Sequence, residues 1–328
     1  MATNSELVDD SSTPPAYDTI FSASPIECDQ SSVFSSRRMK NKRTAVLSRI
    51  RDIVLGPDFT PSSVVPNVNA CAAALPAAEF FKILQKRNIE GHTALYWAIV
   101  NNRPQALWAL NKFIFISGYY SSVCEDDLRD ACMITTNHAI FWQLALGVRS
   151  EDTRLRYFLG CPSDRIQVHM YDEPANQFNV VLRIGMFQKR LRAPATSTTG
   201  DTKLIYEFVA GGRIWWLRFH MPDFTKGIWC VDIGLCWRSH PARLNAVLVI
   251  EAHSRKPGST APPEALKIPF SLTDTKFVAL APLKTDHPRP SNITWHIEKE
   301  LGDWVMHDKT PYVDDEGTLN ATLEITLL

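Results

Sequence analysis

The spacing of apolar residues changes at about residue 160, and this change limits the folds open to the chain. Before that point apolar residues recur at helical spacing, and from Asp164 onward they alternate with polar residues. A helical period places one stripe of a helix against a core, whereas a period of two gives a strand with one buried face. The sequence therefore predicts a multidomain α+β chain, with a helical domain at 68–160 and an antiparallel β domain at 164–328.

The second half contains several alternating runs separated by Gly, Pro and Ser clusters. The clearest runs are 178–184, 215–219, 229–237, 244–250, 266–270 and 319–327. One apolar and one polar face per strand indicates antiparallel sheets with one side open to water, and about eight to ten such strands imply a β-sandwich. We expect the tryptophans of these strands to lie in its core.

The segment 88–113, NIEGHTALYWAIVNNRPQALWALNKF, predicts two short helices joined by a turn. Gly91 suits a tight turn, and Thr93 can cap the helix that follows. Leu95 and Ala98 fall on one face of that helix, and Pro104 suits the first turn of the next helix. Such a hairpin cannot cover its own apolar face, so it needs neighbours.

This segment resembles the ankyrin repeat. The family signature T-P-L-H-x-A is matched by TALYWA at 93–98, with Ala94 in place of Pro and Tyr96 in place of His. Three apolar positions recur 33 residues further along, as Leu95 and Leu128, Ala98 and Ala131, and Leu107 and Ile140, and Asp126 takes the capping place of Thr93. The resemblance covers about 70–145, with 76–87 as the second helix of a degenerate preceding unit. It implies stacked hairpins and a role in protein binding. The alternative is an ordinary helical bundle.

Two strings in the β domain are similar to the MATH or TRAF-type sandwich, namely GGRIWWLRFHMPD at 211–223 and VDDEGTLNATLEITL at 313–327. That likeness also implies peptide or adaptor binding, but it carries no binding residue over to this chain. The alternative for this domain is an enzyme, or a module that binds carbohydrate or another ligand.

The first 36 residues are rich in Ser, Thr, Asp and Pro, with six acidic side chains and no Lys or Arg. We expect this tail to be disordered, because it lacks the apolar area that would offset the entropy of ordering. It contains Pro14, Pro15 and Tyr17 in the string PPAY, which matches the PPxY motif that WW domains bind as a polyproline II helix. A WW-domain protein is thus a candidate partner.

A basic amphipathic helix is predicted at 37–56, followed by a Pro/Ser linker at 57–67. Between residues 37 and 55 seven basic side chains face only one acidic side chain. The basic patch consists of Arg37, Arg38, Lys40, Lys42 and Arg43. Three alternatives remain open for this helix: docking on the next domain, a nuclear import signal, or contact with anionic lipid or an acidic partner.

Composition and motifs narrow the classes of function. The 35 basic and 35 acidic residues cancel, so nucleic acid is not expected as the main partner. The sequence contains no secretory signal and no apolar run long enough to span a membrane, so any membrane contact would be peripheral. It also lacks a CxxC pair, a Gly-rich phosphate loop, G-x-S-x-G and H-E-x-x-H.

We therefore expect no catalytic residue, no metal and no cofactor. The leading hypothesis is a protein–protein interaction scaffold or adaptor of the cytoplasm or nucleus, recruited to a WW-domain protein through its tail. Oligomeric state is left open.

Overall fold

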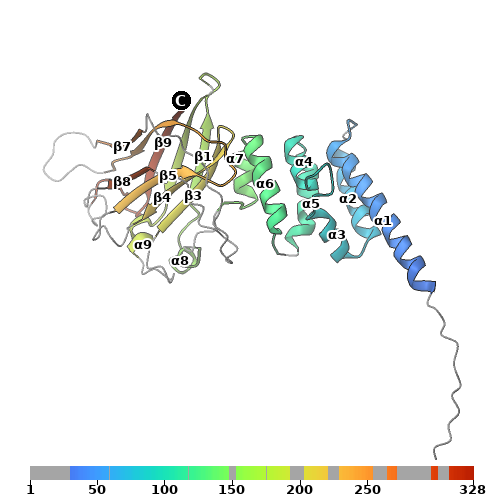
Figure 1. The fold of residues 1–328 in the computed structure, drawn as a ribbon. Coiled ribbons are helices and arrows are strands. Elements are labelled where there is room, and N and C mark those ends of the chain that lie inside the picture. Colours follow the sequence, from blue (N-terminus) through green and yellow to red (C-terminus); the bar gives the residue numbers. More distant parts are fainter. Residues whose placement is uncertain are drawn as a thin grey trace, which may run out of the picture.

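The computed structural model describes residues 30–58, 60–116, 118–147, 153–174, 176–192, 203–220, 229–253, 264–271, 297–301 and 310–328. Helices make up the first half and antiparallel sheets most of the second half, which confirms the α+β prediction. Figure 1 shows the helices side by side between the free end of α1 (Gln30–Leu55) and the sheets.

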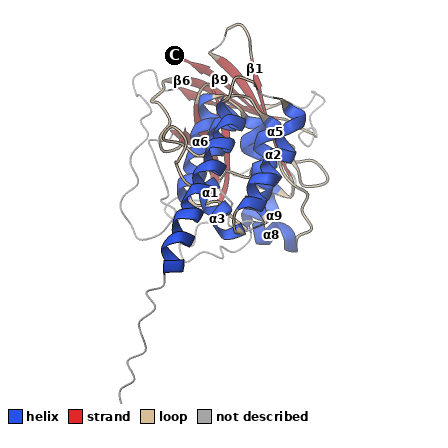
Figure 2. Ribbon diagram, turned by 90° about the vertical axis from the view of Figure 1, so that its right-hand side faces the viewer, coloured by secondary structure: helices blue, strands red, loops and turns tan. Residues whose placement is uncertain are grey.

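Seven helices precede the sheets in the described part of the chain up to residue 147. After α1 they are α2 (Pro61–Ala74), α3 (Ala77–Leu84), α4 (Ala94–Val100), α5 (Pro104–Phe115), α6 (Ser122–Ile134) and α7 (His138–Gln143). Helix α4 packs between α1 and α6 (Figure 1). Helix α2 packs against α5, and the two lie side by side in Figure 2. Each helix thus covers the apolar face that its neighbour cannot cover alone.

The structure corrects the predicted ends of the basic helix and the linker. Helix α1 begins at Gln30, because no Pro or Gly between Gln30 and Arg37 stops a helix from extending backwards, and it ends before Gly56. The predicted linker 57–67 is helical from Pro61, because Pro61 occupies the first turn of α2, where a missing N–H costs nothing. Of the predicted tail, residues 1–29 lie outside the described residues.

The capping residues of the helices are also partly different from the prediction. Thr93 caps α4 by accepting a hydrogen bond from the Tyr96 backbone N–H at 3.3 Å. In the second repeat unit, which begins with α6, the capping residue is instead Ser121, whose side chain accepts a hydrogen bond from the Cys124 backbone N–H at 3.2 Å. Asp126 therefore lies inside α6 instead of capping it, because the helix starts earlier than the 33-residue spacing implies.

Two antiparallel sheets follow. The five-stranded sheet has the order β1 (Arg165–Met170), β2 (Gln177–Ile184), β9 (Leu319–Leu327), β6 (Leu244–Ile250) and β7 (Leu266–Ser271). The four-stranded sheet has the order β3 (Lys203–Ala210), β4 (Arg213–His220), β5 (Trp229–Leu235) and β8 (Ile297–Leu301). Buried side chains of both sheets, such as Phe178 and Trp215, belong to one hydrophobic cluster. Short helices α8 (Thr153–Phe158) and α9 (Phe187–Arg192) lie outside the sheets.

The four-stranded sheet is buried on both faces along much of β3 and β4, which corrects the prediction of one wet side. Helices α6 and α7 pack on its second face, so Val209, Ile214 and Trp216 join the hydrophobic cluster of the helices. Gly234 of β5 makes room for the Trp216 ring, because a Cβ at residue 234 would lie 2.4 Å from that ring. Trp237, expected in the core, lies beyond β5 and is exposed.

Candidate functional site

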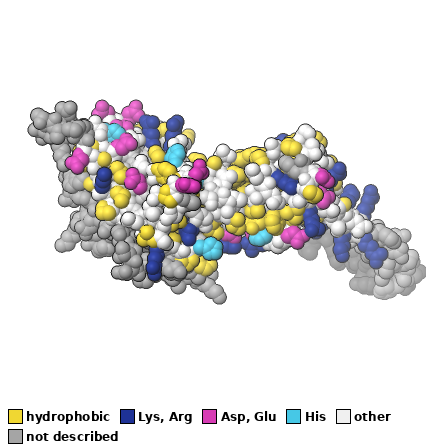
Figure 3. Space-filling view, turned by 90° about the horizontal axis from the view of Figure 1, so that it is seen from above, with side chains coloured by type: hydrophobic (Ala, Val, Ile, Leu, Met, Phe, Trp, Pro, Cys, Tyr) yellow, Lys and Arg dark blue, Asp and Glu magenta, His cyan; other side chains and the backbone are white. Residues whose placement is uncertain are grey.

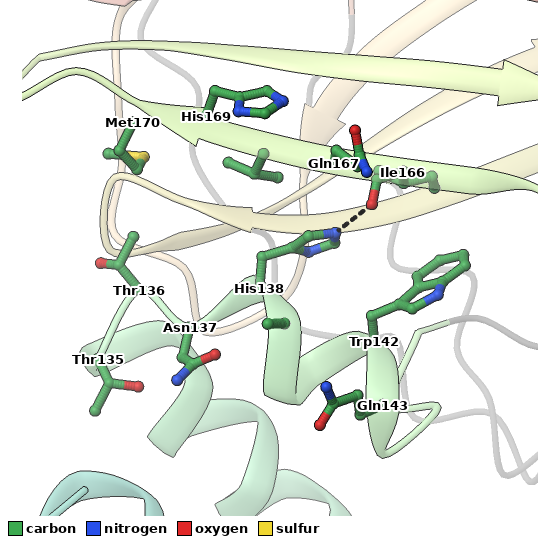
Figure 4. Close-up of a pocket in the computed structure, with 12 residues that line it drawn as sticks. Thr135, Thr136, Asn137, His138, Trp142, Gln143, Ile166, Gln167, His169 and Met170 are labelled. Carbon is green, nitrogen blue, oxygen red and sulfur yellow. Dashed lines mark hydrogen bonds between the residues drawn. The ribbon is translucent and has the colours of Figure 1, made fainter.

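A groove of about 580 Å³ lies where the helices meet the five-stranded sheet (Figure 4). One wall is strand β1, and the other is the α6–α7 turn together with α7. Its lining residues are Thr135, Thr136, Asn137, His138, Ala139, Trp142, Gln143, Ile166, Gln167, Val168, His169 and Met170. We call it the junction groove. Its volume falls within the range usual for ligand-binding pockets.

Strand β1 is the edge strand of its sheet among the described strands, and it presents its free edge to the groove. On the side away from β2, the Ile166 carbonyl lies 3.2 Å from His138 Nε2. On the opposite side, the Tyr171 N–H donates to the Gln177 carbonyl at 3.3 Å. Backbone groups alternate in direction along a strand, so those of Val168 and Met170 point the same way as those of Ile166, into the groove.

Local sequence fixes the opposite wall. Asn137 caps α7 by accepting a hydrogen bond from the Ile140 N–H at 2.9 Å. The preceding residue, Thr136, takes a φ of 51°, which turns the chain sharply from α6 into α7. The first residue of α7, His138, is thereby aimed at the sheets. This turn brings the helices and β1 close enough to enclose the groove.

His138 bridges both sheets. Its Nδ1 accepts the Val209 N–H of β3 at 3.3 Å, so its Nε2 carries the proton and donates to the Ile166 carbonyl of β1. Burial lowers the pKa of His138 below its ordinary value, although the bond to Ile166 partly opposes this. His138 is therefore a neutral link that closes one end of the groove, and both ring nitrogens are already occupied.

The remaining lining residues offer hydrogen bonds and an aromatic surface. Trp142 is 43 % exposed, and Gln143, Gln167 and His169 are exposed as well. None of these four side chains has a hydrogen-bond partner among the residues that the structure describes. The part of the lining that the structure describes contains no carboxylate, Lys or Arg. The described lining of the junction groove is thus suited to binding an uncharged ligand.

The predicted site residues lie elsewhere. Arg37, Arg38, Lys40 and Lys42 are exposed at the free end of α1, and Arg43 pairs with Glu79 of α3 at 3.5 Å. Figure 3 shows Lys and Arg side chains gathered at this end of the molecule. Pro14, Pro15 and Tyr17 lie outside the described residues. The basic patch is not near the junction groove, whose helical wall is formed by the α6–α7 turn and α7.

The residues of the repeat signature occupy structural positions. Gly91 has a φ of 79° in the turn before α4, and the side chains of Leu95 and Ala98 are buried. Sequence reasoning missed Asp127, a fully buried residue of α6. Its carboxylate accepts the Thr93 N–H and the Arg87 Nε–H, each at 2.7 Å, and so joins two consecutive helical hairpins. The recurrence of apolar residues at Leu128 and Ala131 predicts the buried face of α6, but it does not predict that the neighbouring Asp127 is buried as well.

A second polar cluster lies on the four-stranded sheet. His220 Nε2 is 2.9 Å from an Asp232 carboxylate oxygen, and Arg218 pairs with the same carboxylate through its Nε at 2.7 Å. Cys230 lies directly opposite His220 in the β4–β5 pair. Burial raises the pKa of Asp232, but the His220 hydrogen bond and the Arg218 charge outweigh it, so the pKa is lowered. All these side chains are largely buried. They line neither the junction groove nor a second described cavity, of about 310 Å³, that is lined by Arg213, Pro241, Ala242, Arg243, Leu327 and Leu328.

Comparison with models of known protein families gave no match, and comparison with curated proteins gave none either. Within the described ranges, no group of three His, Cys, Asp or Glu side chains is arranged to hold a metal ion. No helix in the described part of the chain has both the length and the apolar character needed to cross a membrane.

Proposed function

We propose that this protein is a protein–protein interaction adaptor. Its tail would recruit a WW-domain protein, and the junction groove would hold a second partner. The helices form a short ankyrin-like stack in this proposal, and the two sheets form a β-sandwich. The likeness of the β domain to MATH or TRAF-type domains stays a prediction.

The observation that carries the proposal is the continuity of the hydrophobic core across the junction. Val46 and Ile50 of α1 belong to the same cluster as Val209 and Trp216 of the four-stranded sheet. Arg129 of α6 reinforces the contact, because it donates to Glu207 of β3 at 2.8 Å. A body joined in this way holds the cationic end of α1 and the junction groove at a fixed separation, which suits a scaffold.

Three features support the finer description of the fold. The α4–α5 hairpin has a capped first helix of seven residues and a Pro at the start of its second helix. Helices α1, α4 and α6 pack in succession, as the first helices of stacked hairpins do. The two sheets share one set of buried residues between them, as the layers of a sandwich do.

The basic patch has two roles in this proposal. The apolar stripe of α1 docks on α2 and α4, while the exposed cations at its free end serve as an import signal or contact an acidic surface. Localisation in the cytoplasm or nucleus is proposed on the same basis. Deleting 37–43 and following the protein in cells by fluorescence separates import from other roles.

The experiment for the first partner uses the full chain and an isolated WW domain. We expect binding through Pro14, Pro15 and Tyr17, and loss of at least about tenfold in affinity with Tyr17→Ala, because the aromatic anchor of the motif is removed. Ser12→Ala, in the same tail and outside the motif, is the matched control. Equal affinity of Tyr17→Ala and the unchanged chain, measured by isothermal titration, would refute this recruitment.

One observation favours a second candidate function, an enzyme. Cys230, His220 and Asp232 are the residue types of a nucleophile, a base and an orienting carboxylate. The adaptor is preferred because these three side chains are buried away from both described cavities, whereas the junction groove is open to a partner.

A further inference from the structure

Strand β1 has backbone hydrogen-bonding groups that its own sheet does not use. The N–H and C=O groups of Val168 and Met170 point into the junction groove, and no described residue pairs with them through a backbone hydrogen bond. Groups of this kind at a sheet edge form a template for another extended chain. A chain that pairs with these groups must present backbone N–H and C=O groups at the spacing of a β-strand.

We propose that the junction groove binds an extended, uncharged peptide segment of a partner protein, which adds to β1 as a further strand. This inference rests on the proposed adaptor function and names how the second partner is held. Pairing would start at Val168 and continue to Met170. It would stop before Ile166, whose carbonyl is already taken by His138.

The lack of charged side chains in the described lining limits which peptide segments can bind in the groove. None of the described residues lining the groove is Asp, Glu, Lys or Arg, so a charged side chain seated against them would lose water without gaining a carboxylate, Lys or Arg as partner. On an added strand, alternate side chains would face Val168 and Met170, and the others would share the face of Gln167 and His169. The expected pattern is therefore apolar residues alternating with hydroxyl or amide residues.

The walls of the groove argue against a second copy of this chain as the occupant. The edge of β1 is flanked by the α6–α7 turn and α7, which lie in the space where a second sheet with its own helices would have to enter. A single extended segment needs only the separation of neighbouring strands, about 4.8 Å. Trp142 and Gln143 can then contact its side chains from the helical wall.

The test begins with a random peptide display library selected on the full chain. Selected peptides are titrated against Ala139→Arg, which places a long cation in the groove on an exposed position of α7. The matched control is Ala78→Arg, which makes the same change on an exposed position of α3. We expect Ala139→Arg to abolish binding and Ala78→Arg to leave it unchanged, with thermal melts showing that both variants fold.

Strand addition is then tested by methylating one backbone nitrogen of the bound peptide at a time. Only two residues of an added strand, two positions apart, donate to the Val168 and Met170 carbonyls, so methylation should weaken binding by about tenfold at those two positions and leave the position between them near the original affinity. Equal losses at consecutive positions, with Ala139→Arg still blocking binding, would overturn strand addition and leave the adaptor proposal standing.

Other occupants give different results. Suppose that no peptide is selected, that a glycan from an array binds the chain, and that Ala139→Arg blocks this binding. This result would overturn the proposal of a peptide ligand and indicate a carbohydrate-binding module. Self-association that depends on concentration and is blocked by Ala139→Arg would overturn it in favour of a second copy. If no peptide is selected and no WW domain binds, both this inference and the adaptor function fail.

Discussion

Single buried polar residues hold the parts of this molecule together. Asp127 joins two helical hairpins, Arg129 joins α6 to β3, and His138 joins α7 to both sheets. Each is satisfied by partners on another element. Since an unpaired polar group in a core costs about 1–3 kcal/mol, these contacts favour one relative placement of the elements over others.

His138 makes the stability of the junction depend on pH. Its pKa is lowered by burial in the folded chain, while in the unfolded chain it returns to about 6.5. Below about pH 6.5 the unfolded state binds more protons, so the free energy of unfolding falls as the pH drops, by at most about 1.4 kcal/mol per pH unit for this group.

The comparison that checks it is urea unfolding of the unchanged chain and of His138→Gln between neutral and mildly acidic pH. Glutamine can still donate and accept but cannot take up a proton. We expect a shallower loss of stability with falling pH in His138→Gln. Parallel curves for the two proteins would mean that His138 is not the linked group.

The sequence predicted the structural roles of some residues of the repeat and gave no indication of the roles of others. Thr93 caps a helix, and Leu95 and Ala98 are buried, because capping and helical spacing are local properties. The roles of Asp127 and His138 depend on partners 28 to 71 residues away along the chain, such as Thr93, Ile166 and Val209. No local pattern encodes those distances, so the junction groove was missed.

At the scale of elements, the main difference from the prediction concerns burial. Alternation along β4 correctly indicates that Trp215 and Leu217 face one core. Trp216, on the opposite face, was expected in the core of the sandwich, but it is buried under α6 and α7 and belongs to the hydrophobic cluster of the helices. Alternation of apolar and polar residues predicts which face of a strand is buried in its own sheet's core. It does not predict that helices from another part of the chain will pack on the opposite face.

Helix α1 behaves as part of the helical core and not as a separate basic element. Its Ile50 and Val54 are fully buried, and two of its last carbonyls accept hydrogen bonds from Asn101 and Arg103 at 2.7–2.8 Å, while Arg103 also donates to the carbonyl of Gly56, just beyond the helix, at 2.6 Å. The side chains of the α4–α5 turn therefore complete the C-terminus of α1, where four carbonyls lack helical partners. This arrangement explains why a strongly cationic helix is held in place.

Ile50→Ala tests that docking. We expect it to lower the free energy of unfolding by about 2–5 kcal/mol, because it leaves a cavity under α1. Arg49→Ala, an exposed neighbour on the same helix, should change it by less than about 0.5 kcal/mol. Urea unfolding monitored by tryptophan fluorescence gives both values. Similar small effects for the two variants would show that α1 is not packed in the core.

At the scale of the whole molecule, the helices and sheets form one body that carries two different surfaces. The cationic end of α1 lies at one end of the body (Figures 1 and 3), and the junction groove lies where the helices meet the sheets (Figure 4). A second contact across the junction joins Arg238 to Asp130 and, at 3.7 Å, to Asp126 of α6. The sequence predicted both halves of the chain, but their relative placement depends on these long-range pairs.

The central claim is that this body bridges two partners. It is tested most directly by mixing the full chain with a WW domain and with a peptide selected on the groove, and measuring the mass of the complex by sedimentation velocity. The account predicts one species containing all three components, which loses the WW domain with Tyr17→Ala and the peptide with Ala139→Arg. Two ligands that displace each other, or a groove variant that retains its peptide, would contradict it.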